Sequence, residues 1–148
     1  MKNVIDQALQ HINPIVCYNS RVKMLNRLIN ARYDSVLKQY GLTGSQFTLL
    51  LFIGKAKSTN QKMIADLLMI NFTTVSREVT KVKAAGWLLF EKGIDARNSW
   101  ISLSEKGRAL LTAALPVWTK INNEMEDLLG DVASAGLNDM INALKAKK

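Results

Sequence analysis

Short hydroxyl and cationic side chains recur at helical spacing in the stretch NFTTVSREVTKVKAAG, from Asn71 to Gly86. The apolar residues of this stretch fall within about 80° of one another on a helical wheel, and polar residues cover the opposite side. The apolar set is Phe72, Val75, Val79 and Val82, and the polar set is Thr73, Thr74, Arg77, Thr80 and Lys81. Hydroxyl groups can approach phosphates and base edges, and a guanidinium can pair with guanine in a major groove. This pattern predicts recognition of double-stranded DNA.

Within this helix, four residues are expected to lie nearest the DNA: Thr73, Thr74, Ser76 and Arg77. Ser76 lies closer to the apolar edge of the wheel than the others. Lys81 is equally consistent with a phosphate contact and with a solvated charge. An ordinary solvated helix surface is the alternative for the whole polar face. The local charge favours DNA, because residues 55–83 hold six basic and two acidic side chains.

Two strand-like runs follow this helix. WLLFE and SWISL are rich in aromatic and branched aliphatic residues, and the intervening KGIDARN carries turn-forming residues. A β-hairpin with a charged tip is therefore predicted. Arg97 at the tip is expected to enter a minor groove, where the negative potential favours a guanidinium. Asp95 is expected to orient Arg97 or an arginine of the preceding helix, and the alternative is a turn-forming aspartate.

The elements that must position these side chains are helices. Asn13 followed by Pro14 predicts the start of a long helix that ends near Gly41. Thr43 and Gln46 have the spacing of a capping box, and the following FTLLLFI predicts a centrally buried helix. A short helix after residues 58–60 is separated from the polar-faced helix by only a tight turn. This is the spacing of a helix-turn-helix.

Further helices lie towards the end of the chain. Ser104 can cap a helix with a long apolar side, which Pro116 is expected to kink and which ends at Gly130. A last helix begins near Asp131. Both ends of the chain thus offer more apolar helix surface than a small helix-turn-helix core needs. That surplus predicts a partner subunit and therefore a homodimer.

Cys17 is the single cysteine, and its thiol could be oxidised, which is a chemistry separate from DNA binding. It lies near the start of the predicted first helix, where a helix N-terminus lowers the pKa of a thiol and favours its oxidation. The alternative is that Cys17 is a small hydrophobic core residue.

His11, the single histidine, has no second histidine with which to bind a metal, so neither a metal nor a cofactor is expected. Without a phosphate loop or a glycine-rich fingerprint, an enzyme is not favoured.

Composition limits the class of partner. The 148 residues fit one domain, and their formal net charge of +8 favours an anionic partner, with nucleic acid ahead of a membrane surface. The first residues lack the apolar core of a signal peptide, and the longest apolar run is too short to span a bilayer. A soluble cytoplasmic protein is expected.

From about residue 17 to residue 130 the chain resembles the MarR family of bacterial transcriptional regulators. The resemblance is carried by YGLTGSQFTLL, NFTTVSREVTKVKAAGWL and DARNSWISLSEKG, and ALPVWTKINNEMEDLLG resembles the proline-aromatic helix that follows in many members. It implies a mainly α fold with a small β-hairpin wing. A winged helix-turn-helix lobe at residues 41–104 would be flanked by dimerisation helices at residues 1–40 and 105–148.

The resemblance also implies a homodimeric repressor that binds double-stranded DNA and releases it when a small aromatic or phenolic effector, or an oxidant, acts. The family location of an effector pocket implies four lining residues, whose spacing equally fits core packing: Arg32, Tyr33, Phe47 and Trp118. Peroxide-sensing relatives keep a cysteine in the region of Cys17. A nonspecific architectural DNA-binding protein is the competing interpretation of the positive charge.

Overall fold

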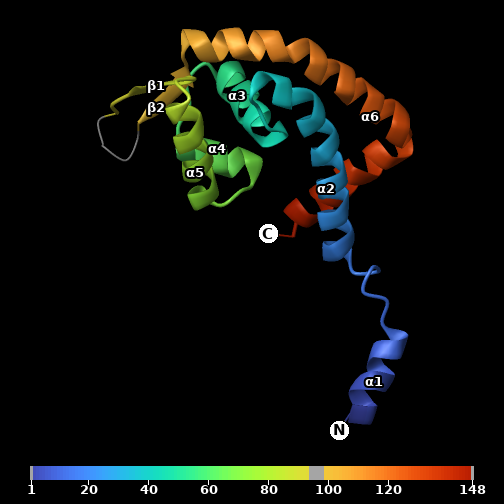
Figure 1. Ribbon diagram of the computed structural model, residues 1–148. Coiled ribbons are helices and arrows are strands. Elements are labelled where there is room, and N and C mark those ends of the chain that lie inside the picture. The colour runs from blue at the N-terminus through green and yellow to red at the C-terminus, as the bar shows by residue number, and fades with distance from the viewer. Residues whose placement is uncertain (1, 94–98, 148) are drawn as a thin grey trace.

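The computed structural model of the chain describes residues 2–93 and 99–147 and is mainly helical with one β-hairpin in those residues (Figure 1). In chain order the elements are α1 (Lys2–His11), α2 (Tyr18–Leu37), the 3₁₀ turn η1 (Lys38–Tyr40), α3 (Gly44–Ala56), α4 (Gln61–Leu68), α5 (Phe72–Ala84), β1 (Leu88–Glu91), β2 (Trp100–Leu103) and α6 (Glu105–Lys145). The prediction of a mainly α fold with a small β-hairpin is confirmed.

The first long helix begins later than the sequence predicts. Asn13 and Pro14 form a turn, in which the Asn13 side-chain oxygen accepts a hydrogen bond from the Ile15 amide at 3.0 Å. The Asn13 carbonyl also accepts one from the Val16 amide at 3.0 Å. Because this local turn satisfies the cap side chain, α2 starts only at Tyr18. The separate helix α1, which precedes the turn, was not predicted and stands apart from the rest of the chain in Figure 1.

The capping box at the start of α3 is confirmed. The Thr43 hydroxyl accepts from the Gln46 amide at 3.2 Å, and the Gln46 side chain accepts from the Thr43 amide at 3.0 Å. An Asp34 carboxylate oxygen of α2 accepts a further hydrogen bond from the Gly44 amide at 2.6 Å. Three of the exposed amides at this helix end are therefore satisfied, and one of these bonds joins α2 directly to the first residue of α3.

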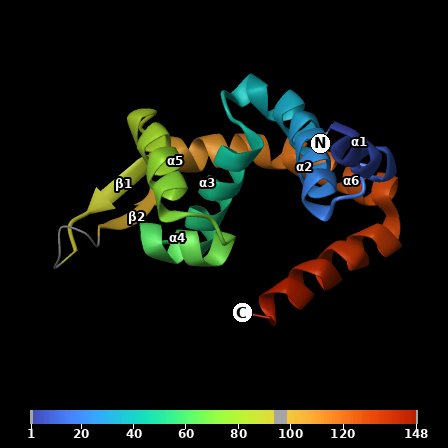
Figure 2. The same ribbon diagram turned by 90° about the horizontal axis from the view of Figure 1, so that it is seen from below.

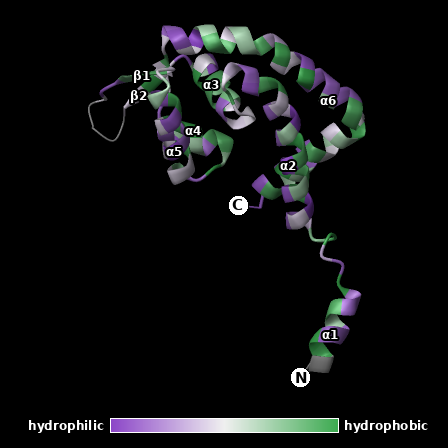
Figure 3. Cartoon of the chain, in the orientation of Figure 1, coloured by the Kyte–Doolittle hydropathy of each residue, from purple (hydrophilic) through white to green (hydrophobic). Residues whose placement is uncertain are grey.

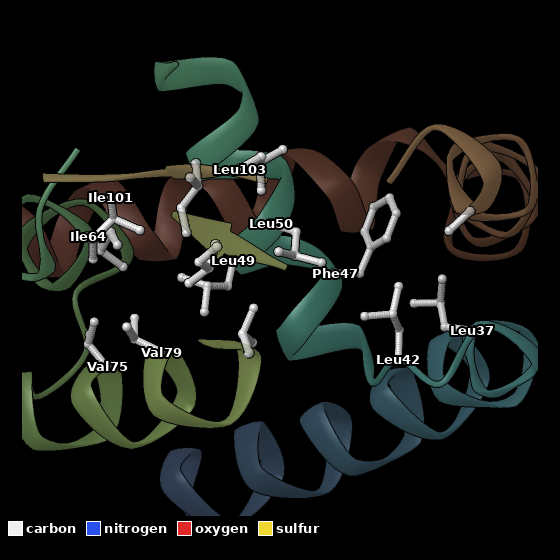
Figure 4. Close-up of a cluster of buried hydrophobic side chains, with 14 of the residues drawn as sticks. Leu37, Leu42, Phe47, Leu49, Leu50, Ile64, Val75, Val79, Ile101 and Leu103 are labelled. Atoms are coloured by element: carbon white, nitrogen blue, oxygen red, sulfur yellow. The ribbon is translucent and has the colours of Figure 1, made fainter. Parts of the chain in front are cut away.

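The hydrophobic core lies around α3 (Figure 4). This helix is apolar nearly all round, and its Phe47, Leu50 and Ile53 have no exposed surface. In Figure 4, Val75 and Val79 point from α5 towards the core, which also contains Ile64 of α4 and Ile101 and Leu103 of β2. The core therefore holds α5 by one face and leaves its opposite face outward.

The two strands pair antiparallel, with Leu88 opposite Leu103 and Glu91 opposite Trp100. Strand β2 of the hairpin is also paired with Thr59, which precedes α4. The Thr59 amide donates to the Ile101 carbonyl at 3.0 Å, and the Ile101 amide donates to the Thr59 carbonyl at 2.7 Å. The hairpin is thus tied to the segment between α3 and α4.

Helix α6 changes direction at Gly130, whose backbone angles are φ 75° and ψ 168°. A positive φ of this size favours glycine, so the predicted interruption at this residue is confirmed. Pro116 lies inside the helix, upstream of the break. Figure 2 shows the part beyond Gly130 turning back from the α2 end of the molecule, separate from α4 and α5. Within the described residues, no helix is both long enough and apolar enough to span a membrane.

Candidate nucleic-acid interface

Helix α5 is fixed at both ends by its capping residues. At its start the Asn71 side chain accepts a hydrogen bond from the Thr73 amide at 2.8 Å. At its end Gly86 has a φ of 78°, and its amide donates to the Lys83 carbonyl at 2.8 Å. Asparagine caps and left-handed glycines are the residues that begin and end helices. The bounds of this helix are therefore set by local chemistry.

The exposed face of α5 carries most of the predicted DNA-contacting residues. Val75, Val79 and Val82 are at most 1% exposed, which turns the opposite face to solvent. Thr73, Thr74, Arg77 and Lys81 are exposed, and Ser76 is half-buried at the edge of that face. We refer to these five residues as the α5 polar face. It has the composition expected of a surface that approaches phosphates and base edges.

Three cations near α5 have different surroundings. The Lys81 ammonium pairs with Glu78 at 2.8 Å on the same helix. The Lys83 ammonium lies 4.3 Å from the centre of the Phe90 ring in β1, so this side chain is directed towards the hairpin. The Lys106 ammonium donates to the Ala85 carbonyl at 3.0 Å, at the carboxyl end of α5. Lys83 and Lys106 thus join α5 to its neighbours.

The junction of α5, the hairpin and α6 is closely packed. The Ser104 hydroxyl donates to the Gly86 carbonyl at 2.7 Å and accepts from the Gly107 amide at 3.0 Å. A Cβ atom at Gly107 would collide with the Trp87 carbonyl oxygen. Only a glycine therefore lets the first turn of α6 approach the chain immediately after α5.

The hairpin bears the other predicted DNA contacts. Strands β1 and β2 form the predicted pair, and the side chains of the strands lie within the described residues. Asp95 and Arg97, predicted at the tip, lie outside the described residues. Their roles stay predictions.

A cavity of about 510 Å³ lies behind α5. Its lining comes from α2, α3, α4, α5 and α6 and includes Ile29, Tyr33, Thr48, Leu68, Thr74, Glu78 and Trp118. Thr74 is itself part of the α5 polar face, and Glu78 lies on the same helix. A molecule in this cavity would therefore contact α2, α6 and α5 together.

Two of the four residues assigned to an effector pocket do not line this cavity. Phe47 is fully buried and stacks on Trp118 with ring centres 5.4 Å apart, because α3 runs through the middle of the core. Arg32 is an exposed residue of α2 and is not among the lining residues. Tyr33 and Trp118 do line the cavity. Thr74 and Glu78 were not predicted as lining residues, because helical periodicity does not specify which element faces each flank of α5.

Tyr33 also joins α2 to α6. Its hydroxyl donates to the Asn122 side-chain oxygen at 2.9 Å, and the Asn122 side-chain amide donates to Glu126 at 2.9 Å. Burial, and then the negative charge of Glu126, raise the pKa of Tyr33 above its usual value. The hydroxyl therefore remains a donor at neutral pH.

Cys17 is exposed and occupies the cap position of α2. The backbone amides of Ser20 and then Asn19 lower the pKa of the thiol, although neither forms a capping hydrogen bond with it. In the single chain the alternative of a buried core cysteine is wrong, because Cys17 is exposed.

Comparison with known proteins agrees with this arrangement. A sequence model of the MarR family matches residues 40–93, which cover α3, α4, α5 and β1. A crystal structure of the Mycobacterium tuberculosis transcriptional regulator MosR in complex with DNA superimposes with a TM-score of 0.79 and 27% sequence identity, covering 89% of this chain and 98% of that chain. Over residues 40–93 the chain is similar to the MarR family.

Other relatives, named as HTH-type transcriptional regulators, match over part of their length. An uncharacterised HTH-type transcriptional regulator of Bacillus cereus is 31% identical over 87 residues, which are 59% of this chain. The match spans 58% of the length of that relative. The HTH-type transcriptional regulator SarZ of Staphylococcus aureus is 24% identical over 115 residues, covering 77% of this chain and 74% of SarZ. The α5 polar face lies inside the segment that matches the MarR family.

Proposed function

We propose that this chain is a MarR-family transcriptional regulator that binds double-stranded DNA at specific sequences. The observation that carries the proposal is the α5 polar face, which the three buried valines and the Asn71 cap hold outward. Recognition helices of helix-turn-helix proteins contact base edges with residues near their N-terminus, where Thr73 and Arg77 lie. The net charge of +8 supports association with a polyanion. The solved complex of MosR with DNA adds support from a relative.

The test is selection of duplexes from a randomised pool, followed by fluorescence anisotropy on the selected duplex and on a scrambled one at physiological salt. A specific regulator is expected to prefer the selected duplex by about a thousandfold or more. A nonspecific architectural protein would bind both duplexes equally and with a steep salt dependence. Equal binding would therefore replace the proposed function by that alternative.

We propose further that the regulator is a homodimer. Apolar side chains of α1, α2 and the part of α6 beyond Gly130 are exposed in the single chain, including Val4, Leu9, Val22, Leu28, Val132 and Leu144. Figure 3 shows these hydrophobic segments on α1 and on the end of α6. Removing such surfaces from water stabilises association. Residues 1–40 and 105–148 are accordingly the proposed dimerisation segments and residues 41–104 the DNA-binding lobe.

We propose that a small aromatic or phenolic effector binds the cavity and releases DNA, so that the protein acts as a repressor. The cavity has apolar and aromatic walls with a few hydroxyl groups, which suits such a ligand. A ligand that binds one orientation of α5 more tightly shifts the population towards that orientation. Phenol added to the protein–DNA complex is expected to lower the anisotropy, and Leu68→Phe, which fills part of the cavity, to weaken this response. No change with phenol would remove this part of the proposal for simple phenols.

Peroxide sensing through Cys17 is a second candidate, favoured by its exposure and lowered pKa. The thiolate would attack one peroxide oxygen, the O–O bond would break, and the departing alkoxide or hydroxide would take up a proton, leaving a sulfenic acid. The chain holds no second cysteine, so an internal disulfide cannot follow. DNA binding that peroxide abolishes in the native protein and not in Cys17→Ser would support this candidate. Equal behaviour of the two proteins would exclude it.

A further inference from the structure

Phe72 departs from the apolar face to which its spacing assigns it. It is 53% exposed, whereas the other members of the same stripe, Val75, Val79 and Val82, are at most 1% exposed. The position of Phe72 around the helix explains this difference. On a helical wheel of about 100° per residue, Phe72 lies at the edge of the buried stripe and next to Ser76. It is also the first residue of α5, beyond the region that the core covers. The ring is therefore left outside the core of its own lobe.

The surroundings of Phe72 are those of a nucleic-acid surface. Helical side chains lean towards the helix N-terminus, so a residue in the first turn lies at the open end of α5. Thr73 and Arg77 lie on the adjoining exposed side, and Ser76 lies one turn further along. On the opposite flank, Thr74 and Glu78 line the cavity, to which Phe72 does not contribute. The ring thus lies at the end of the helix that recognition helices direct at base edges.

The major groove offers one apolar group to such a ring. Each unmodified base pair has a distinct pattern there, and only thymine carries a methyl group, at C5. Thr73, Ser76 and Arg77 can supply hydrogen bonds, and the small methyl group of Thr73 is the only branched apolar group among them. Phe72 adds a much larger apolar surface beside the α5 polar face.

We propose that Phe72 is a specificity-determining residue that packs its ring against the C5-methyl group of a thymine in each half of the bound duplex. This inference rests on the proposed function, because it requires α5 to enter the major groove. It deepens that function by naming the base and the atom that are read.

The experiment removes the methyl group from the DNA and the ring from the protein. A duplex selected by the native protein from a randomised pool is resynthesised with each thymine in turn replaced by deoxyuridine, which lacks only the C5-methyl group. Dissociation constants are measured by fluorescence anisotropy at physiological salt. For the native protein we expect a loss of about fourfold at one thymine of each half-site, the effect of one buried methyl group.

The decisive comparison uses Phe72→Ala and a matched control. Phe72→Ala is expected to bind the thymine duplex more weakly and to lose the difference between thymine and deoxyuridine. Leu67→Ala removes a side chain of α4 that is 57% exposed in the same lobe, and it is expected to keep that difference. Because the readout is a ratio within one protein, a general change in affinity does not affect it. Circular dichroism checks that both variants are folded.

Each outcome decides the inference. A thymine preference that disappears only in Phe72→Ala supports it. Specific binding by the native protein with no effect of any deoxyuridine, or a preference that survives in Phe72→Ala, overturns the role of Phe72 and leaves the proposed function intact. Selection that yields no preferred duplex overturns the proposed function and this inference with it.

Discussion

At the scale of single residues, Arg77 and Tyr33 have contrasting surroundings. Arg77 is exposed on α5 among short hydroxyl side chains, which leaves room for its guanidinium to approach a base edge. Tyr33 is half-buried and hydrogen-bonded to Asn122 across two helices. The first residue is expected to affect DNA binding, whereas the second is expected to affect stability.

Arg77→Ala is expected to relax base preference at one position. A bidentate arginine–guanine contact contributes about 1–3 kcal/mol of discrimination, so the preference for guanine should fall by about five- to hundredfold. Anisotropy with duplexes substituted at each base pair measures this. Lys81→Ala is the control, because loss of a phosphate contact lowers affinity about equally for all duplexes. A uniform loss in Arg77→Ala would show that Arg77 contacts the backbone only.

Tyr33→Phe is expected to lower the free energy of unfolding by about 1 kcal/mol, because the Asn122 oxygen loses its partner. Chemical denaturation measures this loss. Tyr40→Phe, at a half-buried tyrosine of the neighbouring turn, is the matched control. An equal effect in both variants would assign the loss to general packing.

The same hydroxyl predicts a dependence of stability on pH. Burial and Glu126 raise the pKa of Tyr33 in the folded state above the usual value of 10.0. Its contribution is therefore complete below pH 10 and is lost as the pH rises through the folded-state pKa, because the unfolded chain ionises first. Denaturation between pH 9 and about 11 should show a steeper loss in the native protein than in Tyr33→Phe. Parallel curves would contradict this prediction.

At the scale of elements, the junction between α5, the hairpin and α6 sets their relative orientation. Ser104 bonds to both Gly86 and Gly107, so one side chain joins the end of one helix to the start of another. The start of β1 and the end of β2 both lie at this junction, where Leu88 is opposite Leu103. A change of spacing here would move the hairpin relative to the α5 polar face.

Gly107→Ala is expected to destabilise the fold by about 1–3 kcal/mol, because the added methyl group collides with the Trp87 backbone. Thermal denaturation followed by circular dichroism measures the effect. Gly136→Ala is the matched control, since nothing lies within 4 Å of its added Cβ atom and alanine favours a helix. Destabilisation of the same size in both variants would contradict the packing argument.

At the scale of the whole molecule, the lobe around α3 is well packed, while α1 and the end of α6 are not. Figure 1 shows α1 projecting away from the lobe, and Figure 2 shows the part of α6 beyond Gly130 lying apart from α4 and α5. Val132, just after the break, is 90% exposed. Exposed apolar surfaces of this kind are expected to pack against a second copy of the chain.

Val132→Asp is expected to shift the protein from dimer towards monomer, because a carboxylate would have to lose its hydration in the interface. Sedimentation velocity at micromolar concentration measures the distribution. Leu89→Asp, at a 54% exposed position in β1, is the control and should leave the dimer intact. A native protein that sediments as a monomer would refute the proposed dimer.

Local chemistry predicted most of the lobe from the sequence. The Thr43–Gln46 box and Gly86 each act within a few residues, so they specify helix ends without knowledge of the rest of the fold. Gly130 belongs to the same class. The hairpin strands were also predicted, because their composition differs so sharply from that of the helices.

Features that depend on distant neighbours were not predicted. Phe72 has the spacing of its buried valine neighbours, but the core ends before it reaches the first turn of α5. Phe47 was open to two interpretations until the central place of α3 decided for the core. Asn13 and Pro14 have a helix-start composition, and the competing turn at Asn13 delays α2. The roles assigned to individual DNA-contacting residues remain predictions.

The two hydrogen bonds between Thr59 and Ile101 have a thermodynamic consequence. They order β2 against the segment that leads into α4, and α4 packs on α5 in the same lobe. The conformational entropy of aligning these elements is therefore lost when the chain folds and not when it meets a duplex. DNA binding by a surface that is already ordered should therefore lose less conformational entropy than DNA binding by a surface that becomes ordered only on contact with the duplex.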